Sequence, residues 1–128
     1  MIGHKIAQVL AFNNEVIGTS RKQISSTDLG ITNATIIYKD FIIDKSLDFI
    51  SEIMPDVIIN CVGITTRRIN ESNIDDLSFI NSTLPKLIND WSIGNSIKMI
   101  HMSTDCVFTG QSGNYLDDDI PDATDSYG

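Results

Sequence analysis

Basic residues are scarce in this sequence of 128 residues. Nine Lys and Arg side chains stand against seventeen Asp and Glu, so the formal net charge is −8 at pH 7. A protein that binds nucleic acid through its phosphates needs a basic surface to neutralise them. We therefore expect no nucleic-acid partner.

Long apolar runs and cysteines are also lacking. No apolar run approaches the roughly 20 residues of a membrane-spanning helix, and the N-terminus lacks the pattern of a secretory signal. The two cysteines, Cys61 and Cys106, are too few for a disulfide scaffold. With 41% hydrophobic residues and only 3 Pro, the composition is globular. We expect a cytoplasmic, single-domain protein without a membrane partner.

The apolar residues that are present alternate between helical and strand spacing. Helices are predicted over residues 2–13, 47–54 and 74–91, the last broken or kinked near Pro85. Strands are predicted over residues 15–21, 34–38, 57–62 and 97–102. The stretch 25–33 and everything after Phe108 are predicted to be irregular. This alternation predicts an α/β fold with a parallel sheet.

The two ends of the sequence do not fit a complete sheet of this kind. An open α/β sheet normally begins with a strand, whereas this sequence begins within its first predicted helix. It ends in a predicted loop at Tyr127 and Gly128. We therefore expect a fragment, a single incomplete domain over residues 1–128.

Polar residues and glycines gather where the predicted strands end. Ligands of open α/β sheets lie beyond the carboxyl ends of the strands, so these residues form a candidate site. Near its start, the first helix carries Gly3, where the helix N-terminus favours an anion. Arg21 stands at the end of the first predicted strand, where the chain runs into a loop, and a guanidinium pairs well with a ribose 2′-phosphate. An arginine in this position is nevertheless more often only solvated.

The C-terminal third of the chain carries a family resemblance. His101-Met-Ser-Thr-Asp-Cys-Val-Phe-Thr-Gly110, Gly113-Asn-Tyr and Asp122-Ala-Thr-Asp-Ser-Tyr-Gly128 resemble segments of extended short-chain dehydrogenase/reductases. More narrowly, they are similar to the dTDP-4-dehydrorhamnose reductase group of nucleotide-sugar reductases. Pro55-Asp-Val-Ile-Ile-Asn-Cys-Val-Gly63 resembles the fourth strand of that family and the turn that contacts the cofactor.

Two weaker matches extend the resemblance over the rest of the chain. Ile2-Gly-His-Lys resembles the end of the family's glycine-rich turn, with Gly3 as its third glycine. Asn81, followed by Pro85, resembles the helix that carries the family's structural Asn. The resemblance implies a Rossmann-like doubly wound parallel sheet. Its first strand, two turn glycines and C-terminal substrate portion would be missing here.

The resemblance also implies a reaction and its residues. A nicotinamide would deliver hydride to the keto carbon of a nucleotide-linked sugar. Tyr127 would supply the proton and Thr104 would polarise the carbonyl, while Asp105, Val107 and Phe108 would contact the substrate. A tyrosine titrates near pH ~10 and needs a nearby cation to act. The family's Lys for this purpose lies shortly after the Tyr, beyond Gly128, so we expect this fragment to be inactive by itself.

The cofactor implied by the resemblance is NADP(H), with NAD(H) also possible. Arg21 favours the phosphorylated form. By the resemblance Asp40 would meet the adenine edge, and the alternative is a solvated acid in a loop. The residues expected at the cofactor are Gly3, Ser20, Arg21, Asp40, Asn60, Cys61, Gly63 and Ser103. No metal site is expected, because the acidic run after Tyr115 lacks the spacing of a calcium loop.

The resulting hypothesis is the cofactor-binding part of an NADP(H)-dependent reductase of a nucleotide-linked 4-keto-6-deoxysugar, serving cell-surface polysaccharide synthesis. At full length it could form a homodimer. One alternative is an epimerase or dehydratase of the same superfamily. A non-catalytic nucleotide-binding subunit and a remnant without function also stay open. Arg67 and Arg68 could meet a substrate phosphate or only water.

Overall fold

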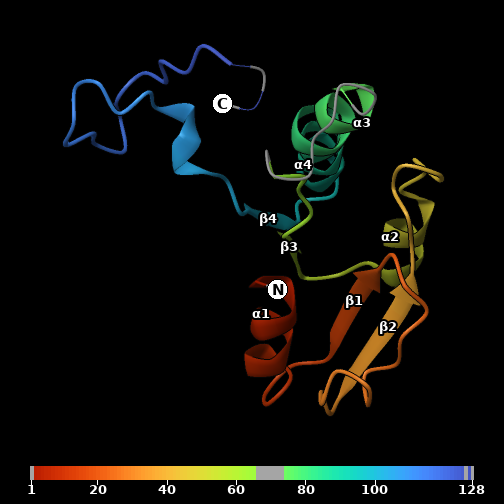
Figure 1. Ribbon diagram of the computed structural model, residues 1–128. Helices are drawn as coiled ribbons and strands as arrows, with labels where there is room; N and C mark the ends of the chain where they lie inside the picture. Colours follow the sequence, from red (N-terminus) through yellow and green to blue (C-terminus); the bar gives the residue numbers. More distant parts are fainter. Residues whose placement is uncertain (1, 66–73, 126, 128) are drawn as a thin grey trace. The chain divides into compact units, whose positions relative to one another are not determined.

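A computed structural model describes residues 2–65, 74–125 and 127 of the chain (Figure 1). The chain divides into two compact units, residues 1–55 and residues 56–128. Each unit contains one pair of parallel strands. The predicted α/β class with parallel strands is therefore confirmed. Arg67 and Arg68 lie outside the described residues.

The first unit consists of two helices and two strands. In chain order they are α1 (Ile2–Leu10), β1 (Val16–Ser20), β2 (Ala34–Tyr38) and α2 (Asp48–Ile53). Strands β1 and β2 run parallel, with Val16 opposite Ala34 and Ser20 opposite Tyr38. Their carboxyl ends therefore meet at one edge, and this edge carries the candidate residues of the first unit.

Side chains of α1 fix the loop between β1 and β2. His4 Nε2 and Gln8 Nε2 lie 2.8 Å and 3.2 Å from the Leu29 carbonyl oxygen, which accepts from both. The next residue, Gly30, has a φ of 63°, a left-handed conformation that glycine adopts without steric cost. The loop predicted over residues 25–33 is confirmed, and α1 holds it in place.

The second unit is built on a longer helical segment. Its elements are β3 (Val57–Asn60), α3 (Ile74–Ser78), the π-helical turn η3 (Phe79–Thr83), α4 (Leu84–Gly94), β4 (Lys98–His101) and the 3₁₀ turn η4 (Asp105–Val107). Strands β3 and β4 pair in parallel from Val57 opposite Lys98 to Asn60 opposite His101. Leu77, Leu84 and Ile88 are buried and form the apolar side of the helical segment.

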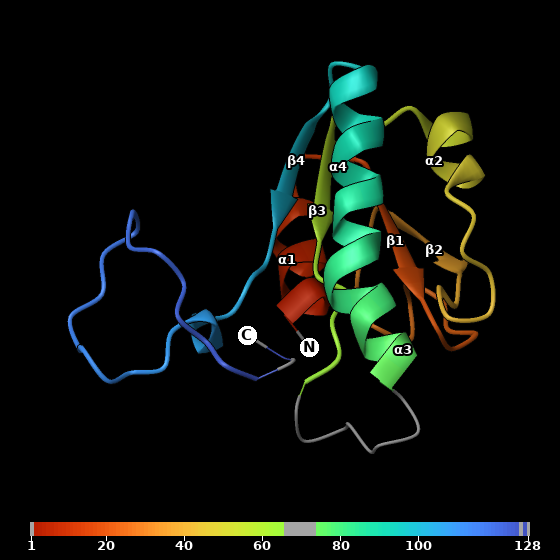
Figure 2. The same ribbon diagram turned by 90° about the horizontal axis from the view of Figure 1, so that it is seen from above.

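The interruption predicted near Pro85 is a π-helical turn rather than a break. Figure 2 shows α3 and α4 joined into one continuous helical rod. Within the π turn, the Leu84 N–H bonds to the carbonyl of Phe79, five residues earlier. Pro85 has no N–H, and in a regular α-helix its ring would clash with the carbonyl of Asn81. A widened turn ahead of Pro85 gives that ring room without ending the helix.

All predicted helices and strands except the strand over residues 34–38 differ from the structure by one to three residues at an end, and the predicted helix over residues 2–13 ends at Leu10. Two of these differences have a visible cause. The apolar run 57–62 continues past the end of β3, which stops at Asn60. There the Asn60 Oδ1 accepts a hydrogen bond from the Val62 N–H at 3.0 Å, which turns the chain away from the ladder. Helix α2 ends before Met54, whose φ of 47° is left-handed. Pro55 follows, and a residue before proline is disfavoured in the helical region.

Candidate functional site

The carboxyl ends of β1 and β2 bring Ser20 and Asp40 to the same edge. The Lys39 N–H donates to the Ser20 carbonyl at 2.9 Å, one residue beyond the β2 strand. This bond joins the two chain segments at the point where each leaves its strand. Residues 20–22 and residue 40 therefore border one edge of the first unit, as the sequence predicted for parallel strands.

Two cations follow β1 at this edge. Arg21 and Lys22 are exposed, and no ion pair of either is found among the described residues. The Lys22 N–H donates to Ser20 Oγ at 3.1 Å, so the turn is held by the serine side chain. The Ser20 hydroxyl keeps its own proton free to donate, because in this bond it only accepts. The arrangement offers an anion two positive charges and a hydroxyl donor.

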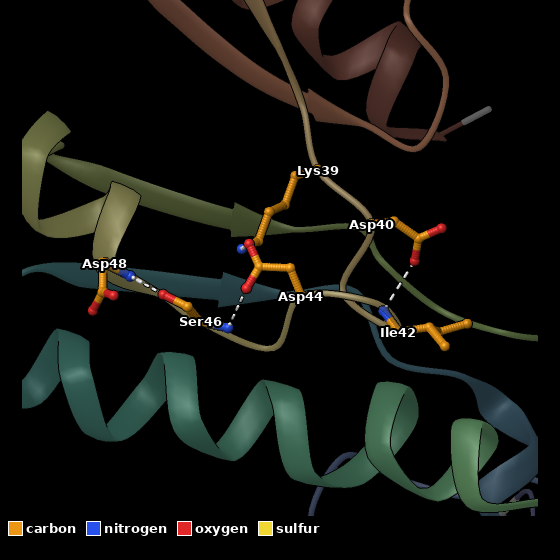
Figure 3. Close-up of polar contacts among 6 residues, drawn as sticks. All are labelled: Lys39, Asp40, Ile42, Asp44, Ser46 and Asp48. Carbon is orange, nitrogen blue, oxygen red and sulfur yellow. Dashed lines mark hydrogen bonds and ion pairs between the residues drawn. The ribbon is translucent and has the colours of Figure 1, made fainter.

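Asp40 begins a tight turn directly after Lys39. Its Oδ1 accepts from the Ile42 N–H at 3.0 Å, and its carbonyl accepts from the N–H groups of Ile43 at 3.2 Å and Asp44 at 2.8 Å. Figure 3 shows the second carboxylate oxygen of Asp40 directed away from this turn. That oxygen has no partner among the described residues, so it can accept from an amino group of a ligand.

Asn60 ends β3 and is 3% exposed. Because its Oδ1 accepts from Val62, its amide nitrogen must be the group that faces His101, with Nδ2 and Nδ1 3.1 Å apart. His101 then accepts this hydrogen bond at Nδ1. Both polar ends of the Asn60 side chain are engaged within the second unit. Its expected contact with a cofactor stays a prediction.

The segment after Asn60 carries two more residues expected at the cofactor. Cys61 is half-buried, and burial raises the pKa of its thiol, so the group stays protonated at neutral pH. Gly63 is exposed, and its φ is not in the left-handed range. A Cβ placed on Gly63 would meet Asn81 Oδ1 at 3.8 Å, an ordinary contact. Within the part of the chain that the structure describes, no contact requires glycine at this position.

Asn81 anchors this segment from the π turn. Its Oδ1 accepts from the Ile64 N–H and its Nδ2 donates to the Ile64 carbonyl, both at 2.8 Å. The π turn places the amide where it reaches both backbone groups of one residue. The structural role that the resemblance implied for Asn81 corresponds to this pair of bonds.

Thr104 caps the 3₁₀ turn η4 that follows β4. Its Oγ1 accepts from the Cys106 N–H at 3.2 Å and lies 3.5 Å from Asp105 Oδ1, to which its hydroxyl donates at the limit of hydrogen bonding. A carbonyl ligand could compete for that proton, because the bond to Asp105 is long. Ser103 and Asp105 are exposed, and Thr104 is half-buried.

A side-chain network closes the loop between residues 107 and 123. Asp122 accepts from the Thr109 N–H at 2.7 Å, the Thr109 hydroxyl at 2.8 Å and the Tyr115 hydroxyl at 3.1 Å. The Val107 carbonyl accepts from the N–H groups of Asp122 and Ala123. Phe108 stacks on Tyr115, with ring centroids 4.4 Å apart. Hydrogen bonds from Thr109, its backbone N–H first, hold the pKa of Asp122 below its usual value.

Nothing in the sequence indicated that the Asp122 side chain would close this loop, so the network was missed. Its members are separated by up to 13 residues of loop, and no spacing rule links a threonine to an aspartate at that distance. The network affects how Val107 and Phe108, both expected at the substrate, are presented. The Phe108 ring already has an aromatic partner on one face.

Tyr127 and Gly3 stand at the two ends of the described chain. Tyr127 is half-buried, and its N–H donates to Asp125 Oδ1 at 2.9 Å. Its phenol hydroxyl has no hydrogen-bond partner among the described residues, so no bond joins it to Thr104. Gly3 is half-buried in the first turn of α1. The roles expected of both residues stay predictions.

Neither a metal centre nor a membrane span emerges from the described part of the chain. No three His, Cys, Asp or Glu side chains lie close enough there to hold a metal ion. No helix within the same residues combines the length and apolarity needed to cross a bilayer.

Comparisons with known proteins agree with the strand arrangement and the segments described above. A family described as the RmlD substrate binding domain matches residues 1–128. The crystal structure of a hypothetical dTDP-4-dehydrorhamnose reductase from Sulfolobus tokodaii is similar, with a TM-score of 0.78 and 28% sequence identity. That similarity covers 99% of this chain but 44% of the reductase chain. No curated protein sequence matches.

Proposed function

Because the chain belongs to the family of the RmlD substrate binding domain, we propose that it is the cofactor-binding part of an NADP(H)-dependent reductase. The substrate of that reductase is a nucleotide-linked 4-keto-6-deoxysugar. The similar solved structure is named for dTDP-4-dehydrorhamnose, which is a sugar of this class. This chain spans less than half of that reductase's length. The activity of a whole enzyme is thus part of the proposal.

The observation that carries the proposal is the edge formed by β1 and β2. It presents two exposed cations, Arg21 and Lys22, and a carboxylate oxygen of Asp40, none of which has an ion-pair or hydrogen-bond partner for its side-chain group within the described part of the chain. In a chain of net charge −8, anion binding must depend on such local charges, since the overall field repels anions. A 2′-phosphorylated adenosine combines a dianionic phosphate with an exocyclic amino group. The donor and acceptor set at this edge fits both groups.

The second unit carries the residues for the reaction. Bound NADPH supplies a hydride for the keto carbon of the sugar. Thr104 donates a hydrogen bond to the carbonyl oxygen and so stabilises its developing negative charge. Tyr127 then gives its phenol proton to that oxygen, which completes the alcohol. The hydroxyl of Tyr127 has no competing partner among the described residues, as this role requires.

Binding of the cofactor by this chain tests the proposal. Isothermal titration with NADPH and with NADH should show tighter binding of NADPH. Arg21→Ala should remove most of that preference, because the guanidinium contacts only the 2′-phosphate. Lys98→Ala, which removes an exposed lysine from β4 in the other unit, is the matched control and should keep it. Binding of neither dinucleotide, or equal binding of both, would contradict the proposal.

A further inference from the structure

A lysine is buried immediately beside the expected adenine contact. Lys39 is 8% exposed. Its Nζ is 2.5 Å from Asp44 Oδ2 and lies 5.6 Å and 5.4 Å from the ring centroids of Phe41 and Phe49. The two rings are themselves in contact, with centroids 6.2 Å apart. We call these four residues the Lys39 cage.

The cage compensates the charge of a residue type that is almost never buried unpaired. The faces of the two rings attract the ammonium group, and Asp44 neutralises it. The hydrogen bond from Lys39, followed by that from the Ser46 N–H, lowers the pKa of Asp44, so the Asp44 carboxylate is ionised at neutral pH. Asp44 keeps 61% of its side chain exposed, and therefore one partner of the pair remains solvated.

The ion pair also closes the turn that carries Asp40. Lys39 stands just before this turn and Asp44 at its end, so their side chains bridge the segment that the backbone bonds of Asp40 begin. Figure 3 shows the series continuing towards α2, where Asp44 Oδ1 accepts from the Ser46 N–H and Ser46 Oγ accepts from the Asp48 N–H. A continuous series of side-chain bonds thus leads from the end of β2 to the start of α2.

Neighbouring side chains fix one another's direction in this segment. The Lys39 backbone N–H is held by Ser20, and its side chain is held in the cage. Because both the backbone N–H and the side-chain Nζ of Lys39 are held, rotation of the backbone at the adjacent Asp40 is restricted. Its Oδ1 bond to Ile42 then leaves only the second oxygen for a ligand.

We propose that Lys39 is a positioning residue that orients the Asp40 carboxylate, and that through it the first unit selects adenine over bases without an exocyclic amino group. This inference rests on the proposed function, because it needs an adenine nucleotide at the β1–β2 edge. Lys39 does not touch the base. It acts by closing the turn through Asp44.

The test compares two dinucleotides that differ in one group. NADPH has an adenine amino group, and its hypoxanthine analogue has an oxygen in that position. Titration of the chain with each gives a ratio of dissociation constants. An amino group donating to a carboxylate should favour NADPH about tenfold. Lys39→Met keeps the length and the contacts with the rings but removes the charge, and it should reduce the ratio to about twofold or less.

Lys39→Arg keeps the charge and should retain the preference. Lys5→Met, on the exposed face of α1, is the matched control and should leave the ratio unchanged. If Lys39 had a purely structural role, Lys39→Met would weaken the binding of both dinucleotides equally. The ratio of dissociation constants therefore separates positioning from folding. Should Lys39→Met fail to fold, Asp44→Asn breaks the same pair at its exposed end and must lower the ratio too.

The outcomes separate this inference from the proposed function. If the parent chain binds neither dinucleotide, the proposed function fails and this inference fails with it. If the parent binds both equally, only the adenine contact of Asp40 and this inference are overturned. If the parent prefers NADPH and Lys39→Met, or Asp44→Asn in its place, keeps that preference, Lys39 has no positioning role while the proposed function stands.

Discussion

Asn81 binds both backbone polar groups of Ile64, accepting from its N–H and donating to its carbonyl, each at 2.8 Å. The pair joins the π turn of the helical segment to the segment that leaves β3. A carboxamide presents an acceptor oxygen and a donor nitrogen side by side, so it satisfies the N–H and the carbonyl of one residue without a change of protonation. The contact therefore depends on the amide and not only on the size of the side chain.

Asn81→Asp should destabilise the second unit although it is isosteric. The carboxylate would keep the bond from the Ile64 N–H but would place an acceptor against the Ile64 carbonyl. Loss of one partly buried bond with such a mismatch costs about 1–3 kcal/mol. Urea unfolding followed by Trp91 fluorescence measures the change. Asn89→Asp, on the exposed side of α4, should change stability by less than about 0.5 kcal/mol.

Gly63→Ala should separate folding from ligand binding. Among the described residues the added Cβ meets Asn81 Oδ1 alone, at 3.8 Å, so the unfolding midpoint should stay close to that of the parent. If a cofactor approaches the backbone at Gly63, the same methyl group should weaken dinucleotide binding severalfold. Thermal unfolding and titration on the same preparation measure both. Unchanged binding together with unchanged stability would remove Gly63 from the cofactor site.

The sequence predicted elements well where local preference decides, and less well where a distant contact does. Strand 34–38 was predicted to the residue, because its β-branched run lies between Asn33 and the polar residues Lys39 and Asp40. In the structure Asn33 has a φ of 58°, which ends the preceding loop. Strand 57–62 was predicted too long, because its apolar composition does not reveal the Asn60 side-chain turn.

The candidate site divides in the same way. Parallel strand ends predicted that Ser20, Arg21 and Asp40 would share an edge, and they do. The sequence did not indicate that Lys39 is buried. Its ring partners, Phe41 and Phe49, lie in a segment predicted as loop and helix, and no spacing rule pairs them with a lysine at the end of a strand. Asp122 was also unpredictable, since its partners are reached only after the chain closes a long loop.

Acidification should open the loop that Asp122 closes. The folded-state pKa of Asp122 is lowered, so its stabilising contribution is fully present above the ordinary aspartate pKa, 3.8. It is lost as the pH falls below that value through the lowered one. The near-UV circular dichroism of the stacked Phe108–Tyr115 pair should therefore decrease in that acidic range. Asp122→Asn should show the decreased signal already at neutral pH, and Asp117→Asn, in the same loop, should behave like the parent.

The two cysteines should differ in their reaction with iodoacetamide. Cys106 is exposed, whereas Cys61 is half-buried and burial raises the pKa of its thiol. Alkylation requires the thiolate, so Cys106 should be modified first at pH about 8. The rate at Cys61 should continue to rise at higher pH, because its thiol loses its proton later than an ordinary cysteine. Peptide mapping by mass spectrometry measures both rates.

In 8 M urea the two rates should converge, since unfolding removes the burial that separates them. Faster modification of Cys61 in the folded chain would show that the segment after β3 is open to solvent, and would contradict its anchoring by Asn81.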